Sequence, residues 1–257
     1  MAEITGARVA LVTGGSKRIG RVIALALAAH GWDVAVHFRN SHADADAVVA
    51  QIKQQGRRAA AIAADLCQEK EVVTLLPRVV QALGPVGLLV NNASVFEQDV
   101  ALTATRQGWD RHIEANLRAP FVLMQGFARQ LPGDAEGAVI NILDERVWKL
   151  TPHFVSYTVS KAGLWTLTQT MALALAPRIR VNAIGPGPTL PSPRQTDDQF
   201  RHQIDMLPLQ RGATPEEIAR AAIFILDSPA MTGQMIALDG GQHLGWAQTS
   251  REPPASE

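Results

Sequence analysis

The feature that most constrains the fold of this chain is an alternation of short apolar runs with longer segments of mixed polarity. The runs are continuously apolar, which is typical of parallel strands buried on both faces of a sheet. They predict seven strands, over residues 8–13, 33–38, 58–65, 86–91, 137–143, 178–184 and 234–239. The segments between them predict helices, over about residues 18–30, 42–55, 68–83, 103–130, 152–176 and 215–227. This order favours an α/β fold, a doubly wound parallel sheet with helices on both faces.

The length and composition favour a single globular domain. Of the 257 residues, 47% are hydrophobic and 19% are charged, which excludes disorder and provides for a sizeable core. No linker or repeat divides the chain, and we expect one domain over residues 1–246. Residues 247–257 are polar and contain two prolines, and we expect a flexible tail there.

Several classes of partner are disfavoured by the charge balance and the residue types. The 24 basic and 24 acidic residues predict neither a nucleic-acid partner nor an anionic membrane partner. The lone Cys67 excludes an internal disulfide and a cysteine-rich site, and no metal is predicted. We read no signal peptide at the N-terminus, and the longest charge-free helical stretch, 162–176, is too short and polar to span a bilayer. We therefore expect a cytoplasmic, soluble enzyme or binding protein.

The stretch TGGSKRIG, residues 13–20, joins the first strand to the first helix. Its glycines let the backbone turn tightly and approach a phosphate, and the following helix N-terminus offers free N–H groups. A glycine-rich turn at this junction is the context that dinucleotide binding requires, whereas the alternative is a plain tight turn. The residues predicted to contact the cofactor here are Gly14, Ser16, Lys17, Arg18 and Ile19.

The end of the second strand indicates which dinucleotide is bound. NAD enzymes usually place an acid there for the ribose hydroxyl, but Asp33 begins this strand and lies at the wrong end of the sheet. The carboxyl end instead carries Arg39, which can hold a 2′-phosphate with its charged fork. This predicts NADP(H) over NAD(H), the alternative being a solvated surface arginine. The predicted contacts are His37, Phe38, Arg39, Asn40 and Ser41.

Polar residues also follow the third and fourth strands. Asp65 and Leu66 end the third, and Asn92, Ala93 and Ser94 follow the fourth. Because the carboxyl ends of parallel strands share one edge of the sheet, we expect these residues to line the cofactor site. The alternative is that they cap turns.

Tyr157 and Lys161 are the proton-handling candidates. They lie four residues apart and share one face of a predicted helix. A cation beside a phenol favours the phenolate and lowers the phenol pKa from about 10, which makes the tyrosine a usable acid or base.

Together these motifs resemble the short-chain dehydrogenase/reductase family over nearly the whole chain. TGGSKRIG, NNAS, YTVSK, RVNAIGPG and GQMIALDGGQ occur in that family's order and spacing. The resemblance implies a Rossmann-type seven-stranded sheet, a catalytic tyrosine, a lysine that binds the nicotinamide ribose, and a water relay anchored by Asn116. It also implies that Pro186, Gly187 and Thr189 close over the nicotinamide.

Two departures from the family pattern narrow the resemblance. Arg18 replaces a usual glycine, and Asp144 replaces the usual serine thirteen residues before the tyrosine. Both features are similar to pteridine reductases and dihydromonapterin reductases, which also carry a phenylalanine shortly after NNAS, here Phe96. This resemblance implies that Phe96 stacks on a pterin, and that Arg18 and Ser94 contact both cofactor phosphate and substrate.

The chemistry of Asp144 supports a nitrogen-containing substrate. A serine hydroxyl can donate to a carbonyl oxygen, whereas an ionised aspartate only accepts and would repel a developing alkoxide. A pterin offers N–H groups and a C=N bond whose nitrogen gains a proton, which Asp144 could serve directly or through Tyr157. Alternatively, Asp144 only caps the loop with Glu145 solvated, or an insertion moves the role to Glu145.

Residues 185–212 form a long proline-rich stretch, and long loops in compact domains are usually binding loops or lids. The side chains that could wall the pocket are Phe200, Met206, Leu207 and Leu209. Trp246 either completes a neighbouring subunit's pocket or packs against its own chain.

The helix over 157–176 is apolar almost all round, so the face turned away from the sheet should meet a second subunit. The resemblance implies a four-helix contact within a tetramer or a dimer, and we expect a homotetramer.

The leading interpretation is NADPH-dependent reduction of a dihydropterin (dihydromonapterin, dihydrobiopterin or dihydrofolate), with hydride to C6 and a proton to N5. The predicted catalytic residues are Asp144, Tyr157, Lys161 and Asn116, and the predicted substrate contacts are Arg18, Ser94, Phe96, Asp144 and Tyr157. The alternatives are a carbonyl reductase of the same family, acting on an oxoacyl group or a sugar ketone, and a non-catalytic NADP(H)-binding regulator.

Overall fold

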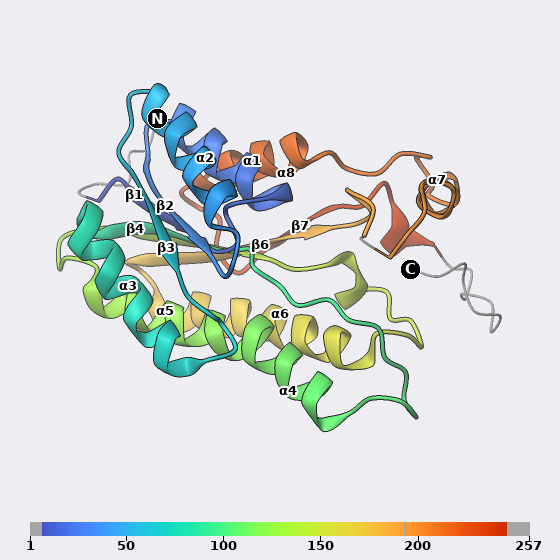
Figure 1. Ribbon diagram of the computed structural model, residues 1–257. Coiled ribbons are helices and arrows are strands. Elements are labelled where there is room, and N and C mark those ends of the chain that lie inside the picture. The colour runs from blue at the N-terminus through green and yellow to red at the C-terminus, as the bar shows by residue number, and fades with distance from the viewer. Residues whose placement is uncertain (1–6, 193, 246–257) are drawn as a thin grey trace.

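A parallel sheet of seven strands forms the centre of the computed structural model, which describes residues 7–192 and 194–245 (Figure 1). The strand order is β3-β2-β1-β4-β5-β6-β7, and all neighbouring pairs are parallel. The strands are β1 Val9–Val12, β2 Asp33–Phe38, β3 Ala59–Ala63, β4 Val86–Asn91, β5 Gly137–Ile142, β6 Ile179–Pro186 and β7 Met235–Leu238. The α/β prediction is confirmed. The predicted tail 247–257 and Trp246 lie outside the described residues.

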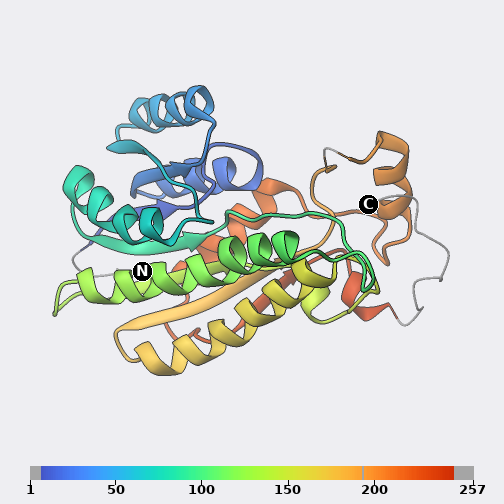
Figure 2. The ribbon, with the colours of Figure 1, turned by 60° about the horizontal axis from the view of Figure 1, so that its bottom comes forward.

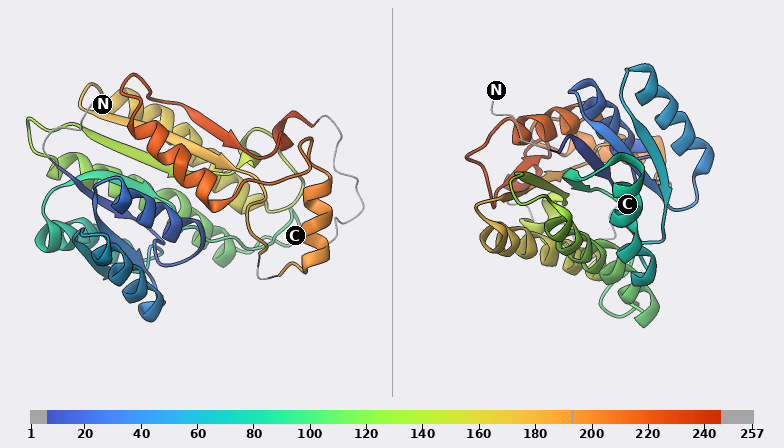
Figure 3. Two further views of the ribbon diagram at one scale, coloured as in Figure 1. Left: turned by 90° about the horizontal axis from the view of Figure 1, so that it is seen from above. Right: turned by 90° about the vertical axis from the view of Figure 1, so that its left-hand side faces the viewer.

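Helices cover both faces of the sheet (Figures 1 and 2). One layer holds α1 Arg18–Ala29, α2 His42–Gln54 and α8 Pro215–Leu226. The other holds α3 Glu69–Leu83, α4 Arg106–Ile113, α5 Ala119–Gln130 and α6 Val155–Leu175. Figure 3 shows α1 and α8 side by side across one face. No helix among residues 7–192 and 194–245 combines the length and apolarity that a bilayer span requires.

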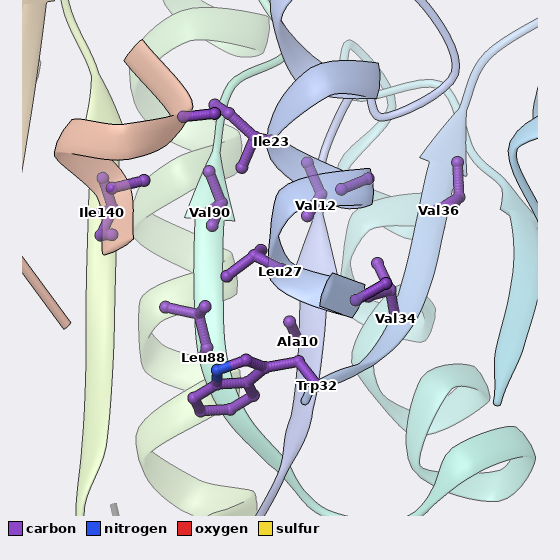
Figure 4. Packing of buried hydrophobic residues seen from close by; sticks show 14 of the residues in the cluster. Ala10, Val12, Ile23, Leu27, Trp32, Val34, Val36, Leu88, Val90 and Ile140 are labelled. Carbon is purple, nitrogen blue, oxygen red and sulfur yellow. The ribbon is translucent and has the colours of Figure 1, made fainter. Parts of the chain in front are cut away.

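Each strand contributes buried side chains to two cores, one on each face. In β1, Ala10 and Val12 belong to the core under α1, whereas Val9 and Leu11 belong to the core under α3 and α5. Figure 4 shows the first core, where Ile23 and Leu27 of α1 pack over β1 and β4. Burial on both faces explains why the strands read as continuous apolar runs.

The single helix predicted over 103–130 is divided into three pieces. A π-helical turn, η1 Glu114–Arg118, separates α4 from α5. Pro120 lacks an N–H, so the carbonyl of Asn116 has no donor four residues on, as an α-helix would supply. Such π-helical turns are frequent at functional sites.

The stretch 185–212, predicted as a loop, contains a further helix, α7 Asp197–Asp205, beyond the carboxyl ends of the strands (Figures 1 and 3). Thr196 and Gln199 form a capping box at its start. The capping box stabilises this short helix, whose residues are mostly polar. The other boundaries differ from prediction by a few residues; α6, for example, begins after Phe154, whose φ is +57°.

Candidate active site

Two adjoining cavities lie beyond the carboxyl ends of the strands. The phosphate-loop cavity, of about 540 Å³, lies beside β1, β2 and β3. The tyrosine cavity, of about 280 Å³, lies beside β4, β5 and β6. They adjoin because both are lined by Arg18, Ile19, Asn92, Ser94 and Phe96.

Most of the predicted cofactor contacts line the phosphate-loop cavity. They are Gly14, Ser16, Lys17, Arg18, Ile19, His37, Arg39, Asp65, Leu66, Asn92, Ala93 and Ser94. Phe38, Asn40 and Ser41 do not line it. Successive side chains of a strand point to opposite faces, so Phe38 packs into the core while His37 and Arg39 face the cavity.

The phosphate loop is held in place by its glycines and by His37. Gly14 has a φ of +61°, and a Cβ on Gly20 would lie 2.2 Å from the Gly14 carbonyl oxygen. The Gly14 N–H donates to His37 Nδ1 at 3.0 Å, while His37 Nε2 lies 3.0 Å from the Ala64 carbonyl. Nε2 therefore carries the proton. Burial lowers the pKa of His37 to about 4, so this ring is neutral.

Arg18 links the phosphate loop to the lid, the stretch of residues 185–212. Its φ is +51°, in the left-handed region that glycine prefers, at the position where the family resemblance placed a glycine. Its guanidinium donates to the carbonyls of Leu190 and Pro191, at 3.2 and 3.1 Å. Arg18 thus spans the boundary between the two cavities.

The charged residues at the two ends of β2 lie where the sequence analysis predicted them. Asp33 is buried at the amino end of the strand, where Arg57 and Arg58 contact its carboxylate at 2.9 and 2.7 Å. At the carboxyl end, Arg39 faces the phosphate-loop cavity. The Lys17 ammonium lies 2.9 Å from Asp44 of α2. A cation therefore stands where an acid would be needed for a ribose hydroxyl.

Tyr157, Asp144 and Lys161 meet in the tyrosine cavity. The Tyr157 hydroxyl donates to Asp144 Oδ2 at 2.8 Å, and Lys161 Nζ donates to the Ile142 carbonyl at 2.8 Å. The ammonium lies 5.8 Å from the centroid of the tyrosine ring. All three side chains line the cavity.

The expectation that the pKa of Tyr157 is lowered is wrong for this arrangement. Burial, and next the negative charge of Asp144, raise the pKa of Tyr157 well above its ordinary value. Lys161 donates to a carbonyl and leaves the hydroxyl to the carboxylate. Burial lowers the pKa of Lys161 to about 8. Tyr157 therefore holds its proton, which suits a proton donor.

Asp144 both caps a turn and faces the cavity. Its Oδ1 accepts from the Arg146 N–H at 2.9 Å at the start of the 3₁₀ turn η2 Glu145–Val147, while Oδ2 accepts from Tyr157. The alternative that Glu145 is solvated is wrong, because Glu145 is only 3% exposed and lines the same cavity. Burial, and next Asp144, raise the pKa of Glu145 to about 8.

Phe96 lines both cavities and forms their aromatic wall. Its ring stacks on Phe154, with centroids 4.5 Å apart and planes at 12°, and meets Tyr157 edge-on at 4.7 Å. The Arg194 guanidinium lies 5.4 Å from its centroid and donates to its carbonyl at 2.9 Å. A ligand beside Tyr157 would therefore meet an aromatic side chain.

Asn116 is buried and fastens the segment after β4. Its Oδ1 accepts from the Val95 N–H at 2.8 Å, and its Nδ2 donates to the Val95 carbonyl at 2.9 Å and to Ser160 Oγ at 3.0 Å. Asn116 lines neither cavity, and its place in a water relay stays a prediction.

The lid contributes less of the wall than expected. Pro186, Gly187, Thr189 and Phe200 line the tyrosine cavity, but Met206, Leu207 and Leu209 do not. Leu207 is buried elsewhere, and Met206 and Leu209 are exposed. Instead, Phe200 and Gln203 of α7 line the cavity, together with Gln195 just before the helix.

The sequence analysis did not predict a buried hydrogen-bond network next to Phe96. The Glu97 N–H donates to His112 Nε2 at 3.1 Å, so Nδ1 carries the proton and faces Ser156 Oγ at 2.7 Å. Ser156 in turn donates to Asp99. Because the serine proton points to the carboxylate and Ser156 is fully buried, this is a structural tie. Only the adjacency of Ser156 to Tyr157 could have indicated it.

Known proteins resemble this chain in sequence and in fold. The short chain dehydrogenase family model matches residues 8–201. The 3-oxoacyl-[acyl-carrier-protein] reductase FabG of Staphylococcus epidermidis is 36% identical over 240 residues, covering 91% of this chain and 98% of that protein.

Two solved structures are more similar in sequence. FolM alternative dihydrofolate reductase 1 from Brucella suis, in complex with NADP, is 46% identical with a TM-score of 0.91, covering 96% of this chain and 98% of that one. FolM alternative dihydrofolate reductase 1 from Brucella canis, complexed with NADP, is 43% identical with a TM-score of 0.90, covering 98% and 100%.

Proposed function

Because this chain belongs to the short-chain dehydrogenase family, an oxidoreductase family, we propose that it reduces a dihydropterin with NADPH. The substrate is dihydromonapterin, dihydrobiopterin or dihydrofolate, and the product is the tetrahydropterin. Hydride reaches C6, and N5 gains a proton.

The residues of the phosphate-loop cavity fit NADP(H). The cavity volume of about 540 Å³ lies in the usual range of ligand pockets. A loop that excludes a Cβ at Gly20 lets its backbone approach a phosphate closely, and Arg39 supplies the charge for a 2′-phosphate. The Brucella structures, at 43 and 46% identity, contain NADP. Bound NADPH supplies the hydride.

The observation that carries the substrate proposal is the hydrogen bond of 2.8 Å from Tyr157 to Asp144. Reduction of a ketone builds negative charge on oxygen, which an adjacent carboxylate would destabilise. Reduction of a C=N bond instead needs a proton at nitrogen. Tyr157 keeps its proton because its pKa is raised, and Asp144 orients the hydroxyl. Phe96 places an aromatic ring beside Tyr157, against which a flat heterocycle can pack.

A second candidate is 3-oxoacyl reduction. The relative from Staphylococcus epidermidis supports it through 36% identity over nearly the full length of both proteins. The same family membership would then use Tyr157 as the acid toward a carbonyl oxygen. Asp144 and Phe96 speak against this candidate together, because neither suits an aliphatic ketone.

The test is NADPH oxidation by the purified protein with the three dihydropterins and with a panel of ketones that includes an acetoacetyl thioester. We expect turnover with at least one dihydropterin and little with the ketones. Reduction of ketones with no reaction toward any dihydropterin would refute the proposal.

Replacing Asp144 tests the role of its carboxylate. We expect Asp144→Ser to lower dihydropterin turnover by about 100-fold or more, as is usual when a proton-handling group is lost. Asp134→Ser, at an exposed loop position, is the matched control and should leave turnover unchanged. Wild-type turnover in Asp144→Ser would remove the argument from nitrogen chemistry.

A further inference from the structure

Two buried oxygen atoms in the tyrosine cavity have no hydrogen-bond partner among the described residues. They are Glu145 Oε2 and Gln242 Oε1. Buried polar atoms are nearly always paired, and leaving one unpaired destabilises the folded protein. Both side chains line the cavity that holds Asp144 and Tyr157. A ligand in that cavity is therefore positioned to satisfy them.

The fold brings these two side chains together from segments far apart in the sequence. Glu145 begins the turn after β5, and Gln242 begins η3 Gln242–Leu244 after β7. The two turns pack against each other: the Trp148 and His243 rings lie 5.3 Å apart, and Lys149 Nζ donates to the Gln242 carbonyl at 3.3 Å. The site is thus built on the ends of two strands.

Gln242 Oε1 lies close to the backbone that the family resemblance places over the nicotinamide. A Cβ on Gly187 would lie 3.1 Å from this oxygen. Phe96, by contrast, follows β4 on the other side of β5 in the strand order. The cavity therefore has an aromatic wall from the β4 side and unpaired acceptors from the β5 and β7 side.

The chemistry of the two groups selects hydrogen-bond donors. The amide oxygen of Gln242 only accepts, and the carboxyl of Glu145, which keeps its proton at neutral pH, accepts through its carbonyl oxygen. Asp144 and Asp239 place further negative charge near Glu145, whereas Arg146 and Lys149 place positive charge there. With both signs present, a neutral O–H or N–H group fits better than an ion.

We propose that Glu145 and Gln242 form a substrate subsite that receives O–H or N–H donors. The identity of those donors rests on the proposed function. A dihydropterin has two sources, the amino and N–H groups of its ring and the hydroxyls of the side chain at C6. The subsite sets affinity for the substrate and leaves the proton transfer to Asp144 and Tyr157.

The test compares KM and kcat of Gln242→Met and Glu145→Met with two substrates. Dihydromonapterin carries hydroxyls at C6, and a second dihydropterin carries only a methyl group there. We expect each variant to raise KM by about tenfold, the effect of losing one or two hydrogen bonds, with kcat changed less than about threefold. A rise confined to dihydromonapterin assigns the subsite to side-chain hydroxyls, and a rise with both substrates assigns it to the ring.

Two controls separate binding from folding. Gln234→Met, at an exposed position, should change neither constant, and Glu145→Gln should keep a KM nearer wild type because its amide oxygen still accepts. Should Glu145→Met not fold, Gln242→Met carries the test. An unchanged KM in Gln242→Met with both substrates overturns the subsite, as does a loss of thermal stability with unchanged KM.

The failure of this inference is distinct from the failure of the proposed function. A wild-type protein that reduces neither dihydropterin refutes the function and this subsite together. A wild-type protein that reduces them, with KM values that neither variant changes, refutes the subsite alone.

Discussion

Arg39 determines the charge at the carboxyl end of β2. It lines the phosphate-loop cavity, and no acid among the described residues forms an ion pair with it. Asp33, the acid of this strand, is held at the opposite end by Arg57 and Arg58. The guanidinium is therefore available to a phosphate on the ribose, and no carboxylate is available to the free hydroxyl.

We predict that Arg39→Asp raises the KM for NADPH by about 10–100-fold, because a charged hydrogen bond worth about 1.5–3 kcal/mol is replaced by repulsion. The KM for NADH should change much less or fall. Steady-state kinetics with both cofactors measure this. Lys53→Asp, an exposed charge reversal at the far end of α2, is the control. Equal effects on NADPH and NADH would contradict the assignment.

Glu145 makes stability depend on pH. Its pKa in the folded protein is about 8, raised from 4.5, so between these values the folded state keeps a proton that the unfolded state has released. The free energy of unfolding therefore falls as the pH rises through this window and levels off above it. Relative to wild type, Glu145→Gln should gain on the order of 1–4 kcal/mol between about pH 5 and about pH 9. Urea unfolding at both pH values tests this, and a constant difference would contradict it.

At the scale of elements, the segment after β4 is held against the start of α6. His112 of α4 binds the Glu97 N–H and Ser156, and Ser156 binds Asp99. Because Ser156 precedes Tyr157, this network connects the segment of Phe96 to the helix that carries the tyrosine. The network thus holds Phe96 and Tyr157, two walls of the tyrosine cavity, although its own residues do not line that cavity.

We predict that His112→Ala destabilises the protein by about 1–3 kcal/mol, since it leaves buried donors and acceptors unpaired. The melting temperature should fall by several degrees, and the KM for dihydropterin should rise more than the KM for NADPH, because Phe96 lies nearest the network. His202→Ala, on the exposed side of α7, should change neither value. An unchanged KM for dihydropterin at reduced stability would limit the network to folding.

The sequence predicted the elements better than their ends and interruptions. Continuous apolar runs identify strands buried on both faces, so all seven strands were found. The helix break at Glu114–Arg118 depends on Pro120, which the apolar pattern does not record. The capping box of Thr196 and Gln199 can be recognised in the sequence, but the surrounding prolines favoured the prediction of a loop.

Within the site, motifs with fixed spacing placed Tyr157, Lys161 and Asp144 correctly in one cavity. Contacts between distant strands could not be predicted in this way. The position of Glu145 and Gln242 in one cavity depends on the packing of two strand ends, and the raised pKa of Tyr157 depends on burial; spacing along the chain gives neither.

At the scale of the whole molecule, the outer face of α6 is the feature that a single chain leaves unexplained. α6 and α4 lie in the layer below the sheet in Figure 1. Val159 is 43% exposed and Leu173 is 83% exposed. They lie fourteen residues apart on one helix, about 21 Å, with Ala162, Thr166 and Gln169 between them at helical spacing. This strip carries no charged side chain and has exposed apolar side chains at both ends, which suits packing against a second helix.

We therefore predict that the protein is a homotetramer at micromolar concentration, with α6 in one of its interfaces. Val159→Glu combined with Leu173→Glu should dissociate that interface, because burying two carboxylates against an equivalent helix leaves both without counter-charges. Both side chains are exposed within one chain, so the folded subunit should persist, as circular dichroism can check. Light scattering measures the mass of both proteins. A wild-type monomer would contradict the assembly, and a tetramer that survives both changes would move the interface away from α6.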